Sequence, residues 1–180
     1  MNWLNLIKRS FMETAIKLYS LEYKQAKTYF ATALFTLGNI IVPQLCHTVN
    51  MGGQTWLPIY LFTLIGAYKY GWCVGLLTAI VSPLLNSALF GMPAWYLLPV
   101  ILLKSVLLAF IAGLAASRLK KASITLFGGV VFAYQTLGTL GEWILKDNLW
   151  LAIQDFRIGI PGMLLQVLGS WLFINHIIRK

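Results

Sequence analysis

One charged residue of this sequence lies within an otherwise apolar stretch. Lys104 is about nine residues into the apolar run 95–117, and a charge at that depth in a membrane costs at least about 2.5 kcal/mol. We therefore expect Lys104 to face a cavity, an acidic partner or an anionic ligand. Glu142, at the outer end of the run 122–141, is the obvious partner for an ion pair. Structural pairing and ligand contact stay equally open, and Glu142 would neutralise the charge that points to an anionic ligand.

Uncharged polar and aromatic side chains are predicted at the same level of the chain as Lys104. A glutamine within a helix commonly only bonds to a neighbouring helix, and interfacial Trp and Tyr often form an aromatic belt. Several of them in one outward half exceed what packing requires, and rings there could stack on a flat ligand. The candidate substrate-binding residues are His47, Asn50, Gln54, Trp56, Asn86, Trp95, Tyr96, Lys104, Gln135, Glu142, Trp143 and Gln166.

Motifs of catalysis are missing from the sequence. It contains no Gly-rich phosphate loop, no pair of histidines at helical spacing, no Cys-x-x-Cys and no Gly-x-Ser-x-Gly. His47 and His176 are predicted on opposite sides of the membrane, so they are not expected to share a metal ion. We expect no enzymatic activity, no catalytic residue, no metal and no cofactor.

The elements that position these residues are long apolar segments. Hydrophobic residues make up 59% of the chain and charged residues 11%, a composition that a soluble domain of this size could not bury. At about 1.5 Å per residue, most of the runs reach across a hydrocarbon core of roughly 30 Å, although the second is short. We expect an all-α integral membrane protein, a compact bundle of six transmembrane helices over 28–180, with runs near 28–46, 56–68, 72–90, 95–117, 122–141 and 158–178.

The first 27 residues read as an amphipathic helix on the inner membrane surface. Trp3, Ile7 and Phe11 fall on one face, and Lys8 and Lys17 fall on the other. A solvated tail is the alternative.

Basic residues predict the orientation of the chain. With the N-terminus inside, eleven of the fourteen Lys and Arg residues are cytoplasmic, as the excess of basic residues in cytoplasmic loops requires. We expect a multi-pass protein of the cell membrane with both termini in the cytoplasm. The net charge of +9 then indicates contact with anionic lipid and not with nucleic acid.

Three stretches resemble the substrate-binding S component of energy-coupling factor (ECF) vitamin transporters: "LGNIIVPQLCH", "GGQTWLPIYLFTLIGAYKYG" and "GLLTAIVSPLLNSALFGMPAWYLLP". The resemblance covers residues 38 to about 117. It rests on Pro43, His47, Gly52, Gly53, Leu57, Pro58, Gly75, Leu76, Ser82, Pro83, Leu84, Leu85, Gly91, Met92 and Pro93.

This resemblance implies a protein that captures a vitamin or related micronutrient from outside and delivers it inward. It implies as partners a transmembrane coupling subunit and two cytoplasmic ATPases. In the family the first three helices mostly face the coupling subunit, and loops 1–2, 3–4 and 5–6 form the site with helices 4 to 6. The expected docking residues are Thr28, Ala31, Thr32, Thr36, Gly71 and Gly75. A ligand-free membrane scaffold and a small membrane-embedded enzyme are the alternatives.

Overall fold

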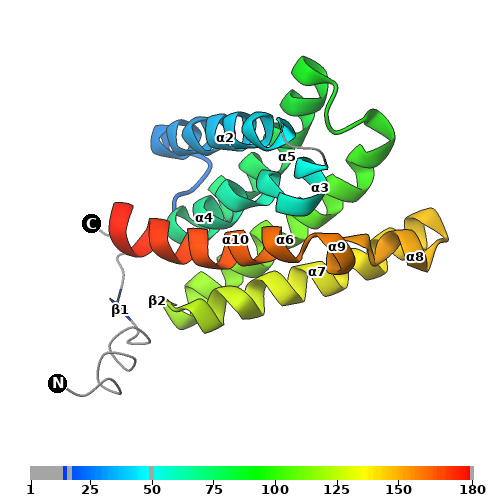
Figure 1. Ribbon diagram of the computed structural model, residues 1–180. Helices are drawn as coiled ribbons and strands as arrows, with labels where there is room; N and C mark the ends of the chain where they lie inside the picture. The colour runs from blue at the N-terminus through cyan, green and yellow to red at the C-terminus, as the bar shows by residue number, and fades with distance from the viewer. Residues whose placement is uncertain (1–13, 16–17, 49–50, 179–180) are drawn as a thin grey trace.

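The computed structural model describes residues 14–15, 18–48 and 51–178, and it is built almost entirely of helices (Figure 1). The α-helices are α2 (Ala26–His47), α3 (Gly52–Trp56), α4 (Leu61–Tyr70), α5 (Trp72–Phe90), α6 (Leu98–Leu119), α7 (Ile124–Lys146), α8 (Leu149–Ala152), α9 (Gln154–Ile158) and α10 (Ile160–Leu172). Short turns precede α4 (η1, Pro58–Tyr60) and α6 (η2, Trp95–Leu97), and a π-helical turn follows α10 (η3, Phe173–Ile177). Strands β1 (Thr14–Ala15) and β2 (Lys121–Ala122) pair antiparallel.

Among the described residues, five helical segments are long and apolar enough to cross a membrane: Ala26–His47, Trp72–Phe90, Trp95–Leu119, Ile124–Lys146 and Ile160–Ile177. This confirms the prediction of an all-α protein with several potential membrane spans. The predicted second span is occupied by η1 and α4, and α4 has only 10 residues. Met51 and Leu57, which flank α3, both adopt left-handed backbone conformations. Such conformations interrupt a right-handed helix, so α3 and α4 do not form one straight helix.

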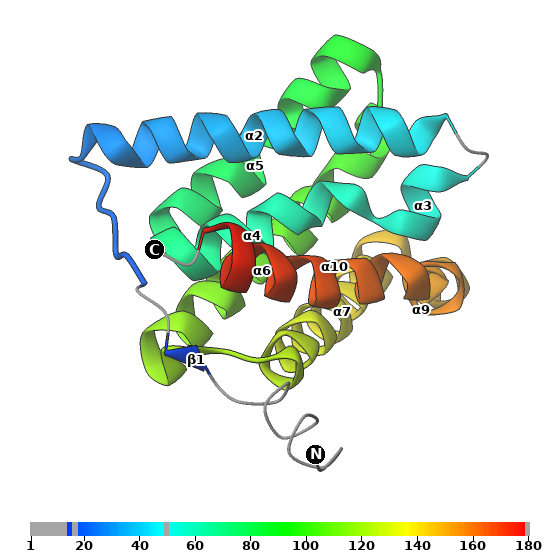
Figure 2. The ribbon, with the colours of Figure 1, turned by 60° about the vertical axis from the view of Figure 1, so that its left-hand side comes forward.

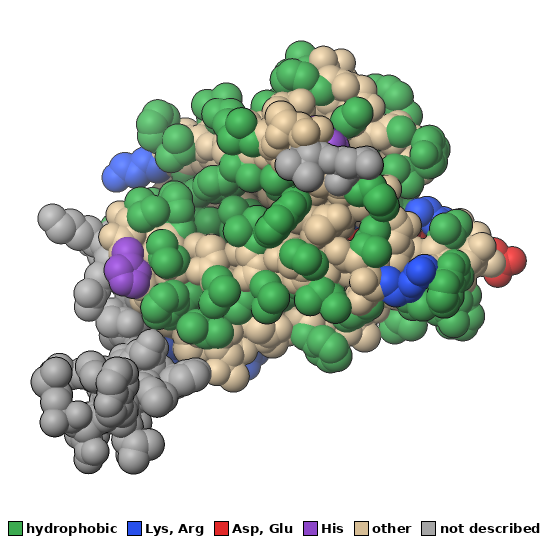
Figure 3. Space-filling view, in the orientation of Figure 1, with side chains coloured by type: hydrophobic (Ala, Val, Ile, Leu, Met, Phe, Trp, Pro, Cys, Tyr) green, Lys and Arg blue, Asp and Glu red, His purple; other side chains and the backbone are tan. Residues whose placement is uncertain are grey.

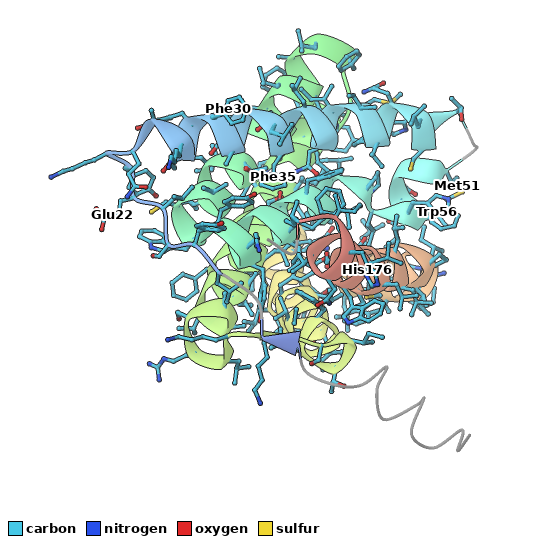
Figure 4. The ribbon with its side chains drawn as sticks, turned by 90° about the vertical axis from the view of Figure 1, so that its left-hand side faces the viewer. Glu22, Phe30, Phe35, Met51, Trp56 and His176 are labelled. Carbon is cyan, nitrogen blue, oxygen red and sulfur yellow. The ribbon has the colours of Figure 1, made fainter. Side chains whose placement is uncertain are left out.

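Apolar side chains cover the outside of the long helices. Phe30, Leu34, Ile41 and Leu45 form an exposed row along α2, and Figure 4 shows Phe30 pointing away from the bundle while Phe35 points into it. A second exposed row, Ile160, Leu164, Leu168 and Leu172, follows α10 at four-residue intervals. Hydrophobic side chains accordingly dominate the face drawn in Figure 3. This pattern suits helices that face lipid, where large apolar side chains can be exposed.

The interior combines large apolar and aromatic side chains with small and polar ones. Leu64, Ala67 and Tyr68 of α4 are fully buried, and this short helix, drawn below α2 in Figure 2, packs against α2, α5 and α6. A Cβ on Gly75 of α5 would lie 2.3 Å from Ala67 Cβ. Glycine is therefore required where α4 and α5 touch, and its small size allows this close approach.

Asn39 of α2 joins three helices by hydrogen bonds. Its Nδ2 donates to Thr63 Oγ1 of α4 at 2.9 Å and to Ser82 Oγ of α5 at 3.2 Å, and its Oδ1 accepts from the Phe62 backbone N–H at 3.2 Å. Asn86 Nδ2 donates to the Asn39 carbonyl at 2.9 Å. The side chain thus uses both its donor and acceptor capacity inside the bundle.

The bundle has two ends that differ in character. The N-terminal end of α2, the two strands and the end of η3 lie together, and we call this the terminal end (Figures 1 and 2). At the opposite end α3, α8 and α9 lie together, and with the connection 91–97 they form what we call the loop end.

The predicted N-terminal helix 1–27 lies largely outside the described residues. Where the chain is described, 14–15 form a strand, 18–25 are not helical, and α2 already begins at Ala26. The backbone N–H groups of Tyr19 and Leu21 donate to the carbonyls of Lys69 and Tyr70, at 2.9 and 3.0 Å. These carbonyls end α4 and need partners, so this segment bonds to another helix instead of forming its own.

Candidate ligand-binding site

A cavity of about 500 Å³ opens at the loop end of the bundle. Its walls come from the end of α2, from α3 and η1, from the connection between α5 and α6, and from α6, α7 and α9. The lining residues are Pro43, His47, Met51, Gly53, Gln54, Leu57, Pro58, Ile59, Tyr60, Asn86, Met92, Pro93, Ala94, Leu97, Val100, Ile101, Lys104, Glu142, Lys146, Gln154 and Asp155. A volume of this size accommodates a drug-sized molecule.

Short elements shape the mouth of the cavity. Figure 4 shows Met51 and Trp56 together at α3, beside the end of α2. The N-terminal turn of α10 meets the chain there, because a Cβ on Gly162 would lie 2.4 Å from the Trp56 carbonyl oxygen. Gln154 of α9 donates to Gln54 Oε1 of α3 at 2.9 Å. These contacts join the connection 147–159 to the segment after α2.

Two lysines and two carboxylates form a buried cluster on one wall. Lys104 Nζ of α6 lies 2.5 Å from Glu142 Oε2 of α7 and 2.9 Å from Asp155 Oδ2 of α9. Lys146 Nζ lies 2.7 Å from Glu142 Oε1, one helical turn along α7. Gln135 Nε2 also donates to Asp155 Oδ2, at 3.1 Å. The predicted pairing of Lys104 with Glu142 is therefore present, and Asp155 is a second partner.

The four charged side chains of this cluster differ in their exposed fraction. The side chain of Lys104 is 2% exposed and that of Glu142 is 8%, whereas those of Asp155 and Lys146 are 18% and 25% exposed. A Cβ on Gly138 would lie only 2.6 Å from Lys104 Cγ, so the absence of a side chain there lets the lysine lie flat against α7. Asp155 and Lys146 are the charged groups most open to a ligand.

The predicted substrate-binding residues divide into three groups. His47, Gln54, Asn86, Lys104 and Glu142 line the cavity. Two others lie behind its walls: Gln135 bonds to Asp155, and Gln166 Oε1 accepts from the Tyr134 hydroxyl at 2.7 Å. Four are exposed and absent from the lining, namely Trp56, Trp95, Tyr96 and Trp143. Asn50 lies outside the described residues.

These four exposed aromatic side chains are therefore not part of the described cavity lining. Their positions agree better with the interfacial belt, the alternative reading of the same residues. The sequence places each of these rings near a loop. It does not determine whether the ring becomes part of the cavity lining.

Several lining residues were missed by sequence reasoning. Asp155, Lys146, Gln154 and Tyr60 line the cavity but were not among the predicted site residues, and Met92 was named only as part of the resemblance. The available signal was that Glu142, Lys146 and Asp155 flank one short connection between two apolar runs. The closeness of these residues in the sequence is compatible with a shared site, but it does not indicate which of the charged groups form ion pairs.

The expected docking residues lie in the interior of the helix bundle. Thr28, Ala31, Thr32, Thr36 and Gly75 are buried, and Gly71 is half-buried. Their small side chains let α2, α4 and α5 approach one another, so they do not offer a surface to another subunit in this structure. The outer face of α2 carries the exposed row from Phe30 to Leu45 instead.

No group of three or more His, Cys, Asp or Glu residues in 14–15, 18–48 and 51–178 is arranged to hold a metal ion. Comparison of the chain with models of protein families, with curated proteins and with solved structures finds no match.

Proposed function

We propose that this protein is the substrate-capture component of an ECF-type importer, a membrane protein that binds a vitamin or related micronutrient and passes it to an ATP-driven module. The observation that carries the proposal is the cavity at the loop end. Its walls include residues from the segments 51–57, 91–97 and 147–159, which correspond to the three loops expected from the resemblance. A buried cluster of charges on one wall of a membrane bundle is a feature of substrate and ion pathways.

In this proposal six segments cross the cell membrane, with η1 and α4 as a short second crossing. The loop end faces outward and the terminal end faces the cytoplasm, as the distribution of basic residues predicts. The coupling subunit and two ATPases are the proposed partners. Because the small residues of α2 are buried, we propose that docking uses the exposed row on this helix.

Ligand binding is tested by thermal unfolding of the purified protein in detergent against a panel of vitamins, nucleobases and amino acids. A ligand at a hundredfold excess over its Kd stabilises the protein by about 2.7 kcal/mol, which corresponds to a rise in Tm of roughly 5–10 °C for a chain of this size. Lysozyme in the same detergent and panel controls for effects of the compounds alone.

A compound that raises Tm should also be taken up by cells that express this chain together with a coupling subunit and ATPases, and uptake should stop without them. If no compound in the panel raises Tm, ligand capture loses its support and a scaffold function becomes the better explanation. Uptake that is independent of the ATPases would instead indicate a stand-alone carrier.

A further inference from the structure

We propose that the cavity selects a ligand that is uncharged overall, a zwitterion or a neutral heterocycle, which donates a hydrogen bond to Asp155 and accepts one from Lys146. This inference rests on the proposed function and names the substrate class of the same site. It replaces the anionic ligand that Lys104 alone suggested, because Lys104 already has two carboxylate partners.

The first argument is the balance of charge in the cavity. Lys104 and Lys146 contribute two positive charges, Glu142 and Asp155 contribute two negative charges, and His47 is counted as neutral. The described cavity wall is therefore formally neutral before anything binds. A ligand with a net charge would leave that charge uncompensated in a largely apolar site, which is unfavourable.

The second argument is the acceptor that remains on Asp155. Both hydrogen bonds to this carboxylate, from Lys104 and from Gln135, end on Oδ2. Oδ1 accepts none from any residue that the structure describes. Glu142, by comparison, has both oxygens in use, one for each lysine. A donor on the ligand therefore meets Asp155 without breaking an ion pair.

The third argument is the donor capacity of Lys146. Its ammonium group has three N–H bonds, and within the described chain it makes a single contact, with Glu142 Oε1. Lys146 is also the most exposed of the four charged side chains. Lys104 is nearly inaccessible and already donates to two carboxylates, so an acceptor on the ligand meets Lys146 first.

The remaining walls specify the body of the ligand. Besides the charged groups, the cavity is lined by apolar side chains, including Met51, Leu57, Met92, Leu97 and Ile101. Such walls favour a ring or another compact apolar body. One donor, one acceptor and an apolar ring describe an aromatic amino acid or a carboxamide or amino heterocycle.

The test compares molecules that share a body and differ in charge. Nicotinamide is matched with nicotinate and 1-methylnicotinamide, phenylalanine with 3-phenylpropanoate and phenethylamine, and tryptophan with indole-3-propanoate and tryptamine. Each is added at the same concentration and neutral pH to the full chain in detergent, and Tm and Kd are measured together with those of the panel above. We expect the uncharged or zwitterionic compounds to bind at least tenfold more tightly than their charged relatives.

Substitutions test the two contacts separately. Asp155→Asn and Lys146→Met should each weaken binding of the best uncharged compound at least tenfold. Asp155→Asn leaves the wall with a net positive charge and should shift the preference toward the anion of the set, whereas Lys146→Met should shift it toward the cation. Lys120→Met, at an exposed position of the terminal end, is the matched control and should leave Kd unchanged. Tm without ligand reports whether each variant folds.

The outcomes separate this inference from the proposed function. Tighter binding of an anion or a cation than of its uncharged relative overturns the inference and leaves ligand capture standing. The same holds if the best binder in the panel carries a net charge, or if both variants bind as the unmodified protein does. If no compound binds, the proposed function fails and the inference fails with it.

Discussion

Lys104 owes its position to three residues that are far from it in the sequence. Glu142 and Asp155 supply two charge-assisted hydrogen bonds, at 2.5 and 2.9 Å, and Gly138 leaves room for the aliphatic part of the side chain. Burial of an ammonium group is tolerated only when its charge and its donors are satisfied together. Lys104 is therefore better described as the structural centre of the cavity wall than as a free contact for an anion.

Removal of this lysine should destabilise the protein as a whole. Lys104→Met leaves Asp155 without its ion-pair partner, whereas Glu142 keeps Lys146, and loss of one member of such a network costs about 3–5 kcal/mol. We expect a lower Tm in detergent, partly restored in the double variant Lys104→Met/Asp155→Asn, in which the unpaired charge of Asp155 is removed. Lys120→Met should not change Tm. An unchanged Tm for Lys104→Met would contradict the structural role.

Contacts between helices depend on a few positions. At some of them only a glycine fits, and at others a side chain forms hydrogen bonds to a neighbouring helix. Gly138 marks the contact of α6 with α7, and Asn39 marks that of α2 with α4 and α5. Both positions lie within long apolar helices, where packing and hydrogen bonds replace hydrophobic burial as the basis of association.

Gly138→Ala should disturb the charged cluster from the facing helix. The new Cβ would lie 2.6 Å from Lys104 Cγ, and the lysine cannot swing aside without leaving its two carboxylates. Overpacking of this kind costs about 1–3 kcal/mol, which Tm measurements will detect. Gly129→Ala on the same helix is the matched control, since nothing lies within 4 Å of its Cβ. If both substitutions lower Tm equally, the contact has no special role.

Asn39→Leu should weaken the contact of α2 with its neighbours. The change leaves Thr63 Oγ1 and the Phe62 N–H without their Asn39 partner, and each unsatisfied buried group costs about 1–3 kcal/mol. Ser82 loses a donor but keeps its hydrogen bond to the Thr78 carbonyl. We expect a clear drop in Tm, whereas the same amide-to-leucine change at exposed Gln25 should have little effect. A stability equal to that of the unmodified protein would show that these hydrogen bonds contribute no net stability.

At the scale of the whole molecule, the two ends should lie on opposite sides of the membrane. Rows of exposed apolar side chains run between them, whereas α3 and the α8–α9 connection gather around the cavity at one end. The proposed function requires a site that opens to the outside, so we propose that the loop end faces outward.

Cysteine labelling tests this orientation. In a chain with Cys46→Ser and Cys73→Ala, a single cysteine is introduced either as Leu149→Cys at the loop end or as Lys120→Cys at the terminal end. A membrane-impermeant maleimide should label the first in intact cells and the second only after the membrane is disrupted. The reverse pattern would place the cavity in the cytoplasm and would contradict import.

Much of this architecture could be predicted because it depends on local sequence. Apolar length places the long helices within a few residues of their observed bounds. The isolated lysine left two alternatives open, a ligand contact and a pair with Glu142, and the pair is present. Five of the predicted site residues line the cavity for the same reason, since they flank the connections that meet at one end.

The tertiary structure alone decided which side chains meet. Asp155 reaches Lys104 because the path of the connection 147–159 brings α9 back over α6, and Gln135 bonds to Asp155 through the same path. The threonines of α2 are buried, and the aromatic side chains Trp56, Trp95, Tyr96 and Trp143 are exposed and absent from the cavity lining, because of how each element is rotated about its own axis. Rotations and loop paths depend on contacts between segments distant in the chain, such as Gly138 with Lys104 and Gly162 with Trp56. Hydropathy, which is local, carries no information about them.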